Sequence, residues 1–228
     1  MHPSSIHYFP LGAVFFLLLT LALAAAVAFV EVGLLRYSYA RMGIERRYVF
    51  ALLLLSLLGS YVNIPIAELR AGQVVKKNEV TFFGMRYVVP VIEDAPRTIL
   101  AVNVGGALVP TMLSIWLVVH HRLYLRALVA VVVVAAIVHQ LAQPVPGVGI
   151  AVPTFVPPIF AALVAVVLSR EAKAPLAYVA GSMGTLLGAD LLNLDSLASM
   201  GASVASIGGA GTFDGVFLSG ILAVLLAW

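Results

Sequence analysis

Long apolar runs separated by short polar stretches dominate the chain. A helix needs about 20 apolar residues, at about 1.5 Å each, to cross the hydrocarbon core of a bilayer. Seven apolar runs predict membrane helices at about 11–30, 48–66, 98–119, a run ending near 142, 155–168, 177–195 and 206–228. We therefore expect an all-α polytopic membrane bundle of about seven transmembrane helices, with residues 1–228 forming a single membrane domain.

The pattern changes in a polar insertion at residues 67–97. Here β-branched and aromatic residues surround Gly84, as in Val80-Thr81-Phe82-Phe83 before it and Tyr87-Val88-Val89 after it. This composition predicts a small extramembrane β-hairpin, with strands over 75–92. Its surface is interpreted either as a plain cap or as a place for a substrate or partner.

A second irregular stretch, residues 144–158, carries several prolines and no charge. Proline interrupts regular helix, so this stretch is either an uncharged outer loop or a non-helical segment buried at membrane depth over a cavity. In the second interpretation Pro146 supports a site in that cavity.

Basic residues lie in short loops beside the apolar runs, which indicates cytoplasmic loops by the positive-inside rule. These residues are Arg36, Arg41, Arg46, Arg47, Arg122, Arg126, Arg170 and Lys173. The expected location is a prokaryotic inner membrane, with the N-terminus outside and the C-terminus in the cytoplasm. The first run could instead be a signal peptide, but no Lys or Arg precedes it, so we expect a retained helix.

Composition supports the membrane interpretation, since 62% of residues are hydrophobic, 10% are charged and the mean hydropathy is +1.09. A soluble domain carries about 25% charged residues. The absence of cysteine excludes disulfides and a cysteine nucleophile. Because the basic residues follow the apolar runs, the net charge of +3 does not indicate a nucleic-acid partner.

Two carboxylates, Asp190 and Asp214, fall inside the last two apolar runs. An Asp at the centre of a spanning helix costs about 2.5–3.5 kcal/mol on insertion, so two in adjacent runs suggest a use. The small, polar stretch 199–203 lies midway between them. If the chain turns there as a helical hairpin, both carboxylates lie at the same depth and can face each other.

A close carboxylate pair can share a proton, activate water as a base and protonate a carbonyl as an acid, which is the chemistry of aspartic proteases. Small residues flank both aspartates, among them Gly188, Gly211 and Gly215. Asn103 adds an amide to the third run, as interhelical glue or as a site residue. No H-E-x-x-H motif is present, and we expect neither a metal nor a cofactor.

The segment Gly211-Thr212-Phe213-Asp214-Gly215 resembles the G-x-G-D motif of presenilins, signal peptide peptidases and prepilin peptidases. The resemblance covers the last two runs and implies catalytic roles for Asp214 and Asp190. Phe213 stands where these families have glycine, Ala189 precedes Asp190 where they have an aromatic residue, and no later Pro-Ala-Leu turn follows. The whole chain, with GADLLNLD and GGAGTFDG, also resembles a prokaryotic membrane family of unknown function.

Three functions remain open at this stage. The first is an intramembrane aspartyl hydrolase acting on a transmembrane peptide. The second is a transporter or channel in which the same aspartates bind a cation or relay protons. The third is a membrane scaffold whose aspartates pair with Asn103, Asn193 or the backbone. All three imply the lipid bilayer as a partner.

Overall fold

The computed structural model describes residues 13–69, 73–82, 85–94, 98–145, 149–194, 196, 204–209 and 215–227. The chain divides into two compact units, Met1–Tyr37 and Ser38–Trp228. Helix α1 (Ala13–Arg41) forms the described part of the first unit and ends in the second. Its stretch Phe16–Arg41 is long and apolar enough to cross a membrane.

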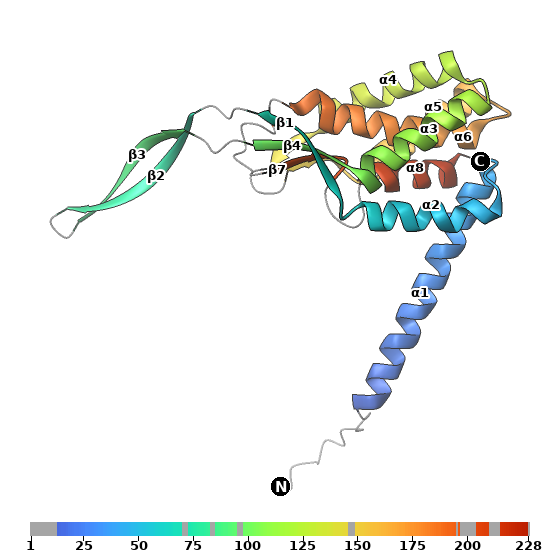
Figure 1. The fold of residues 1–228 in the computed structure, drawn as a ribbon, viewed down its shortest axis with the longest axis horizontal. Helices are drawn as coiled ribbons and strands as arrows, with labels where there is room; N and C mark the ends of the chain where they lie inside the picture. The colour runs from blue at the N-terminus through green and yellow to red at the C-terminus, as the bar shows by residue number, and fades with distance from the viewer. Residues whose placement is uncertain are drawn as a thin grey trace, which may run out of the picture. The chain divides into compact units, whose positions relative to one another are not determined.

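The second unit is mostly helical, with small sheets (Figure 1). Its α-helices are α2 (Arg46–Gly59), α3 (Val109–His120), α4 (Tyr124–Leu141), α5 (Val156–Leu168), α6 (Lys173–Thr185) and α8 (Gly215–Leu226). A π-helical turn, η1 (Val104–Leu108), leads into α3. A second π-helical turn, η2 (Leu186–Asp190), and the 3-10 turn η3 (Leu191–Asn193) extend α6.

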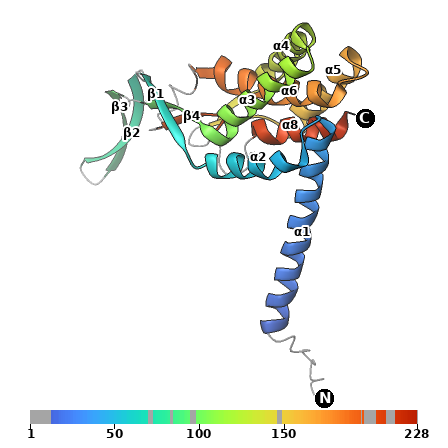
Figure 2. The same ribbon diagram turned by 45° about the vertical axis from the view of Figure 1, so that its right-hand side comes forward.

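Helix α6 is the centre of this unit and packs against α3, α4, α5 and α8 (Figures 1 and 2). It is buried almost along its whole length. Small residues permit this, since a Cβ on Gly184 would lie 2.6 Å from Val134 Cγ1 of α4. A Cβ on Gly181 would lie equally close to the Ser219 carbonyl oxygen of α8. Such small residues at helix contacts are typical of membrane bundles.

The peripheral helices bury small side chains and expose large apolar ones. In α4, Ala127, Ala130 and Ala135 are buried, whereas Leu125 and Leu128 are exposed. Helix α5 repeats this arrangement: its buried residues are Pro157, Pro158, Ala161, Ala162 and Ala165, and its exposed ones include Ile159, Leu163 and Val167. Contiguous apolar surface of this kind marks contact with another apolar phase or partner.

The basic loops lie together at one end of the second unit. His121 Nε2 lies 3.2 Å from the Met42 carbonyl oxygen, which joins the α3–α4 turn to the turn before α2. Arg41 donates to the Ala227 carbonyl oxygen at 3.4 Å, which joins the end of α1 to the residue after α8. We call this the basic end.

A three-stranded sheet lies at the opposite end of the helices (Figure 1). Strand β4 (Thr98–Asn103) pairs antiparallel with β1 (Asn63–Leu69) and parallel with β7 (Val204–Ile207). Two further antiparallel pairs are β2 (Gln73–Phe82) with β3 (Met85–Asp94), and β5 (Gln143–Val145) with β6 (Gly149–Ala151). The hairpin β2–β3 confirms the strands predicted over 75–92, whereas Gly84 itself lies outside the described residues.

Several predicted helix bounds are wrong. Residues 98–103 form β4 instead of the start of a helix, because their apolar side chains and backbone pair with β1 and β7. For the same reason residues 63–66 belong to β1, not to the second helix, and 204–207 form β7. The all-α prediction is therefore corrected to a mostly helical fold with small sheets.

Two described helices are long and apolar enough to cross a membrane, Phe16–Arg41 and Tyr124–Leu141. Three shorter apolar helices are Val104–His120, Val156–Leu168 and Gly215–Leu226. By length and composition, the described residues therefore contain fewer candidate spans than the seven that the sequence predicted.

Candidate functional site

Asp190 is the last residue of η2. The helix changes from α to π winding after α6, and it changes from π to 3-10 winding directly after Asp190. Its side chain is half-buried, and its Oδ2 accepts a 2.6 Å hydrogen bond from the Gly208 backbone N–H. Within the described part of the chain, no hydrogen bond to Oδ1 is present. One oxygen of the Asp190 carboxylate is therefore fixed by the backbone of Gly208. π-Helical turns often occur at functional sites.

Gly188 lets this helix end approach α4 closely. A Cβ at this position would lie 2.5 Å from the Ala135 carbonyl oxygen and 2.9 Å from Val138 Cβ. Asn193 supplies hydrogen-bond donors for carbonyl groups at this helix end. Its Nδ2 donates to the carbonyl oxygens of Gly188 at 2.8 Å and Ala189 at 3.0 Å. Gly188 and Asn193 thus position the backbone that carries Asp190.

Gly208 is the partner of Asp190 and directly follows β7. Its φ of +70° lies in the left-handed region that favours glycine. A Cβ here would also lie 2.7 Å from the Ala107 nitrogen and from the Gly106 carbonyl carbon of η1. Because Ile207 pairs with Val102 of β4, the sheet register sets where the Gly208 N–H points.

Asn103 organises a polar network beside this bond. Its side chain is 2% exposed. Its Nδ2 donates to the Ser60 carbonyl oxygen at 2.7 Å and to Asn63 Oδ1 at 3.0 Å, and its Oδ1 accepts from the Gly106 N–H at 2.8 Å. Ser206 Oγ donates to the same Asn63 Oδ1 at 2.6 Å. Asn103 therefore acts as a structural tie between α2, η1 and β1.

Of the other predicted site residues, Gly215 lies in the described part of the chain and three do not. Gly215 begins α8, and a Cβ there would have nothing within 4 Å. Asp214, Gly211 and Pro146 lie outside the described residues. The Asp190–Asp214 carboxyl separation predicted from the sequence therefore stays a prediction.

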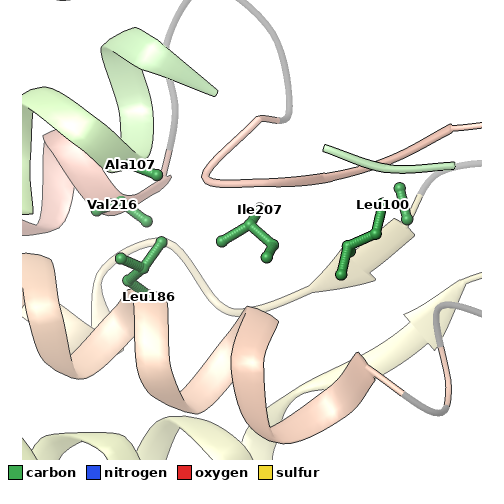
Figure 3. Close-up of a cluster of buried hydrophobic side chains, with 6 residues drawn as sticks. Leu100, Ala107, Leu186, Ile207 and Val216 are labelled. Atoms are coloured by element: carbon green, nitrogen blue, oxygen red, sulfur yellow. The ribbon is translucent and has the colours of Figure 1, made fainter. Parts of the chain in front are cut away.

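A buried apolar cluster contains residues that are close in sequence to each of the two predicted aspartates (Figure 3). Leu186 precedes Asp190 by one helical turn, and Val216 follows Asp214 by two residues. The cluster consists of Leu100, Ala107, Leu186, Ala205, Ile207 and Val216. The start of α8 and the turn η2 thus share one core.

The predicted helical hairpin with a turn at 199–203 is wrong in its second arm. A helix from residue 203 to Asp214 cannot form, because Val204–Ile207 is strand β7 paired with β4. Nor does Asp190 lie at the centre of a regular α-helix, since α6 ends at Thr185 and Asp190 lies in the π-helical turn η2, which the 3-10 turn η3 follows. The equal-depth argument from residue 202 therefore fails, although the two segments still meet in the apolar cluster.

Three residues of this polar region were not predicted: Asn63, Ser206 and the Gly208 N–H. The available signals were weak, namely an Asn before Ile64-Pro65 and the Gly208-Gly209 pair. None of the described residues form a group of three or more His, Cys, Asp or Glu suited to a metal.

The model of a family described as "Protein of unknown function (DUF1614)" matches residues 57–226. No curated protein and no solved structure matches the chain.

Proposed function

Since the chain belongs to the DUF1614 family, which is described only as of unknown function, we propose a function from its own residues. We propose that it is an integral membrane hydrolase in which Asp190 and Asp214 cleave a transmembrane peptide. One observation carries the proposal: Asp190, with one oxygen held by Gly208, stands next to the apolar cluster that also contacts the start of α8.

The membrane part of the proposal rests on the exposed apolar faces. Large side chains of α4 and α5 point outward while alanines point inward, which suits lipid outside and close helix packing inside. We propose about seven spans, including the shorter helices, in a prokaryotic inner membrane. The clustered basic loops support an orientation with the basic end in the cytoplasm and the N-terminus outside.

The chemistry uses the two carboxyl groups in complementary states. The Gly208 N–H holds Asp190 Oδ2, so Oδ1 can bind the attacking water or the Asp214 carboxyl group. The water oxygen attacks the peptide carbonyl carbon, and at the same time the ionised carboxylate takes a proton from that water. The protonated carboxyl group gives its proton to that carbonyl oxygen, and the amine leaves when it is protonated in turn.

A second candidate function is cation or proton transport through the same aspartates. Its supporting observation is that two helices depart from regular α-helix at their ends: η1 begins α3 directly after Asn103, and η2 follows α6 and ends at Asp190. Transporters use interrupted helices to form ion sites near the bilayer midplane.

The test uses the full-length protein in liposomes with a panel of transmembrane peptides, and mass spectrometry detects cleavage products. Asp190→Asn and Asp214→Asn should each abolish cleavage, whereas Glu171→Gln, at an exposed position between α5 and α6, should leave it unchanged. Aspartate-dependent cation or proton flux without cleavage would favour transport. If neither cleavage nor flux depends on the aspartates, the scaffold is the better account.

A further inference from the structure

A groove of about 600 Å³ runs between α2 and α3 of the second unit. This volume is within the usual range of about 300–1,000 Å³ for ligand pockets. Its walls are apolar, and their side chains include Leu52, Leu55, Val109, Met112, Leu113 and Trp116. Its polar lining residues, Glu45, Tyr48 and His120, all lie at the basic end.

The groove lies between two contacts that join α2 and its preceding turn to the η1–α3 segment and its following turn, one contact at each end. At the sheet end the backbones touch, since a Cβ on Gly59 would lie 2.9 Å from the Gly105 nitrogen. A Cβ on Gly105 would collide with the Ser56 carbonyl oxygen. Towards the basic end the facing residues are large, and the helices leave space between them. At the basic end His121 Nε2 lies 3.2 Å from the Met42 carbonyl oxygen, so the groove extends between this contact and the glycine contact.

Cations flank the mouth of the groove, the end lined by Glu45, Tyr48 and His120, although Arg46 and Arg47 are not themselves lining residues. Arg46 and Arg47 begin α2, and both side chains are exposed. Glu45 is the acidic group at the mouth, and its Oε2 pairs with Arg47 Nε at 2.7 Å. The exposed Arg122 adds a further cation in the α3–α4 turn. Among the described residues, these cations beside the mouth outnumber the acidic lining residue Glu45.

Aromatic residues lie at the mouth of the groove. The Arg47 guanidinium lies 4.7 Å from the centre of the Tyr48 ring. On the facing helix Trp116 stacks on His120, with ring centroids 4.7 Å apart. Tyr and Trp gather where hydrocarbon meets headgroups, and cytoplasmic clusters of Arg attract anionic headgroups.

We propose that this groove binds an anionic phospholipid, with one acyl chain between α2 and α3 and the phosphate against Arg46 and Arg47. The apolar walls suit the chain, and the cationic mouth suits the headgroup. The inference does not depend on the two aspartates, because the groove lies between other helices.

The test measures lipid retained by the full-length protein in native mass spectrometry, after exchange into detergent with phosphatidylglycerol, phosphatidylethanolamine or phosphatidylcholine. The unmodified protein should retain phosphatidylglycerol preferentially. Each of Arg46→Gln and Arg47→Gln should reduce that retention by about fivefold. Ala51→Trp, which fills the groove, should reduce retention of every headgroup.

Matched controls separate this site from general membrane attraction. Arg126→Gln removes an exposed cation from α4, and Ala136→Trp enlarges an exposed alanine of α4, a helix that contributes no residue to the groove lining. Both should retain phosphatidylglycerol as the unmodified protein does. Equal retention of all three lipids, or no effect of Ala51→Trp, would overturn the proposal. So would quantitative disulfide trapping between Ala51→Cys and Leu19→Cys or Leu23→Cys, because α1 would then fill the groove.

Discussion

The Gly208 backbone N–H donates a 2.6 Å hydrogen bond to Oδ2 of Asp190. This bond joins the residue after β7 to the end of the helix that contains α6 and η2. It connects parts of the chain on either side of the undescribed stretch 197–203. The bond also fixes the position of the Asp190 carboxylate, which the sequence had indicated only as a charge within an apolar run.

Replacing Asp190 should separate its structural role from its charge. Asp190→Asn keeps an acceptor for Gly208 and should unfold within a few degrees of the unmodified protein. Asp190→Ala leaves that N–H without its partner, at a cost of about 1–3 kcal/mol. At about 2–4 °C per kcal/mol, thermal unfolding in detergent micelles should show a lower Tm for the alanine variant. Equal Tm values would mean that the bond contributes nothing to stability.

Gly208→Ala should destabilise the protein more strongly. The new Cβ meets η1 at 2.7 Å, and a positive φ costs a residue other than glycine about 1–2 kcal/mol. With about 1–3 kcal/mol for the collision, the free energy of unfolding should fall by about 2–5 kcal/mol. Gly33→Ala on α1 is the control, because nothing lies within 4 Å of its Cβ and alanine favours helix. A Gly208→Ala protein as stable as this control would contradict the expected strain.

Asn103→Leu should destabilise the junction of sheet and helices. The change removes the cap on the Gly106 N–H and leaves the Ser60 carbonyl oxygen without this donor. Loss of a cap and of a buried hydrogen bond together should cost about 2–4 kcal/mol in chemical unfolding. Asn63→Ala, at an exposed position of the same network, should cost about 1 kcal/mol. The reverse order of the two effects would show that Asn103 is not the main tie.

The contact of α4 with α6 should appear as a coupling between Gly184 and Val134. Gly184→Ala places a methyl group 2.6 Å from Val134 Cγ1 and should cost about 1–3 kcal/mol. Val134→Ala makes room, so the double variant should be at least about 1 kcal/mol more stable than additivity predicts. Gly184→Ala with Val49→Ala on α2 should be additive. An additive Gly184/Val134 pair would mean that these helices do not pack as described.

The environment of α4 can be tested at Val132, whose side chain is 53% exposed. In water, Val132→Arg would be nearly neutral at this exposed position. In lipid it should reduce membrane insertion by about 2.5–3.5 kcal/mol, which carbonate extraction of cell membranes can detect. Leu125→Arg, at the basic end of the same helix, should insert normally because its charge can reach the interface. Full insertion of Val132→Arg would contradict a lipid-facing position.

The sequence by itself determined the helices that form from continuous apolar runs. It also determined the β2–β3 hairpin, which contains no such run. Residues 124–141 and 156–168 are helical where apolar runs predicted helices, and β-branched residues around Gly84 predicted β2 and β3. In these elements the local composition and the final environment agree, so no distant partner is needed to choose between helix and strand.

Tertiary structure alone decided the sheet and the candidate site. A short apolar run such as Thr98–Asn103 fits a buried helix or a buried strand equally well, and its pairing with β1 and β7 made it a strand. That pairing brings Asn103, Asn63 and Ser206 together and orients the Gly208 N–H towards Asp190. Hydrogen bonds between segments far apart in the chain depend on register and packing, which the apolar pattern of one segment does not contain.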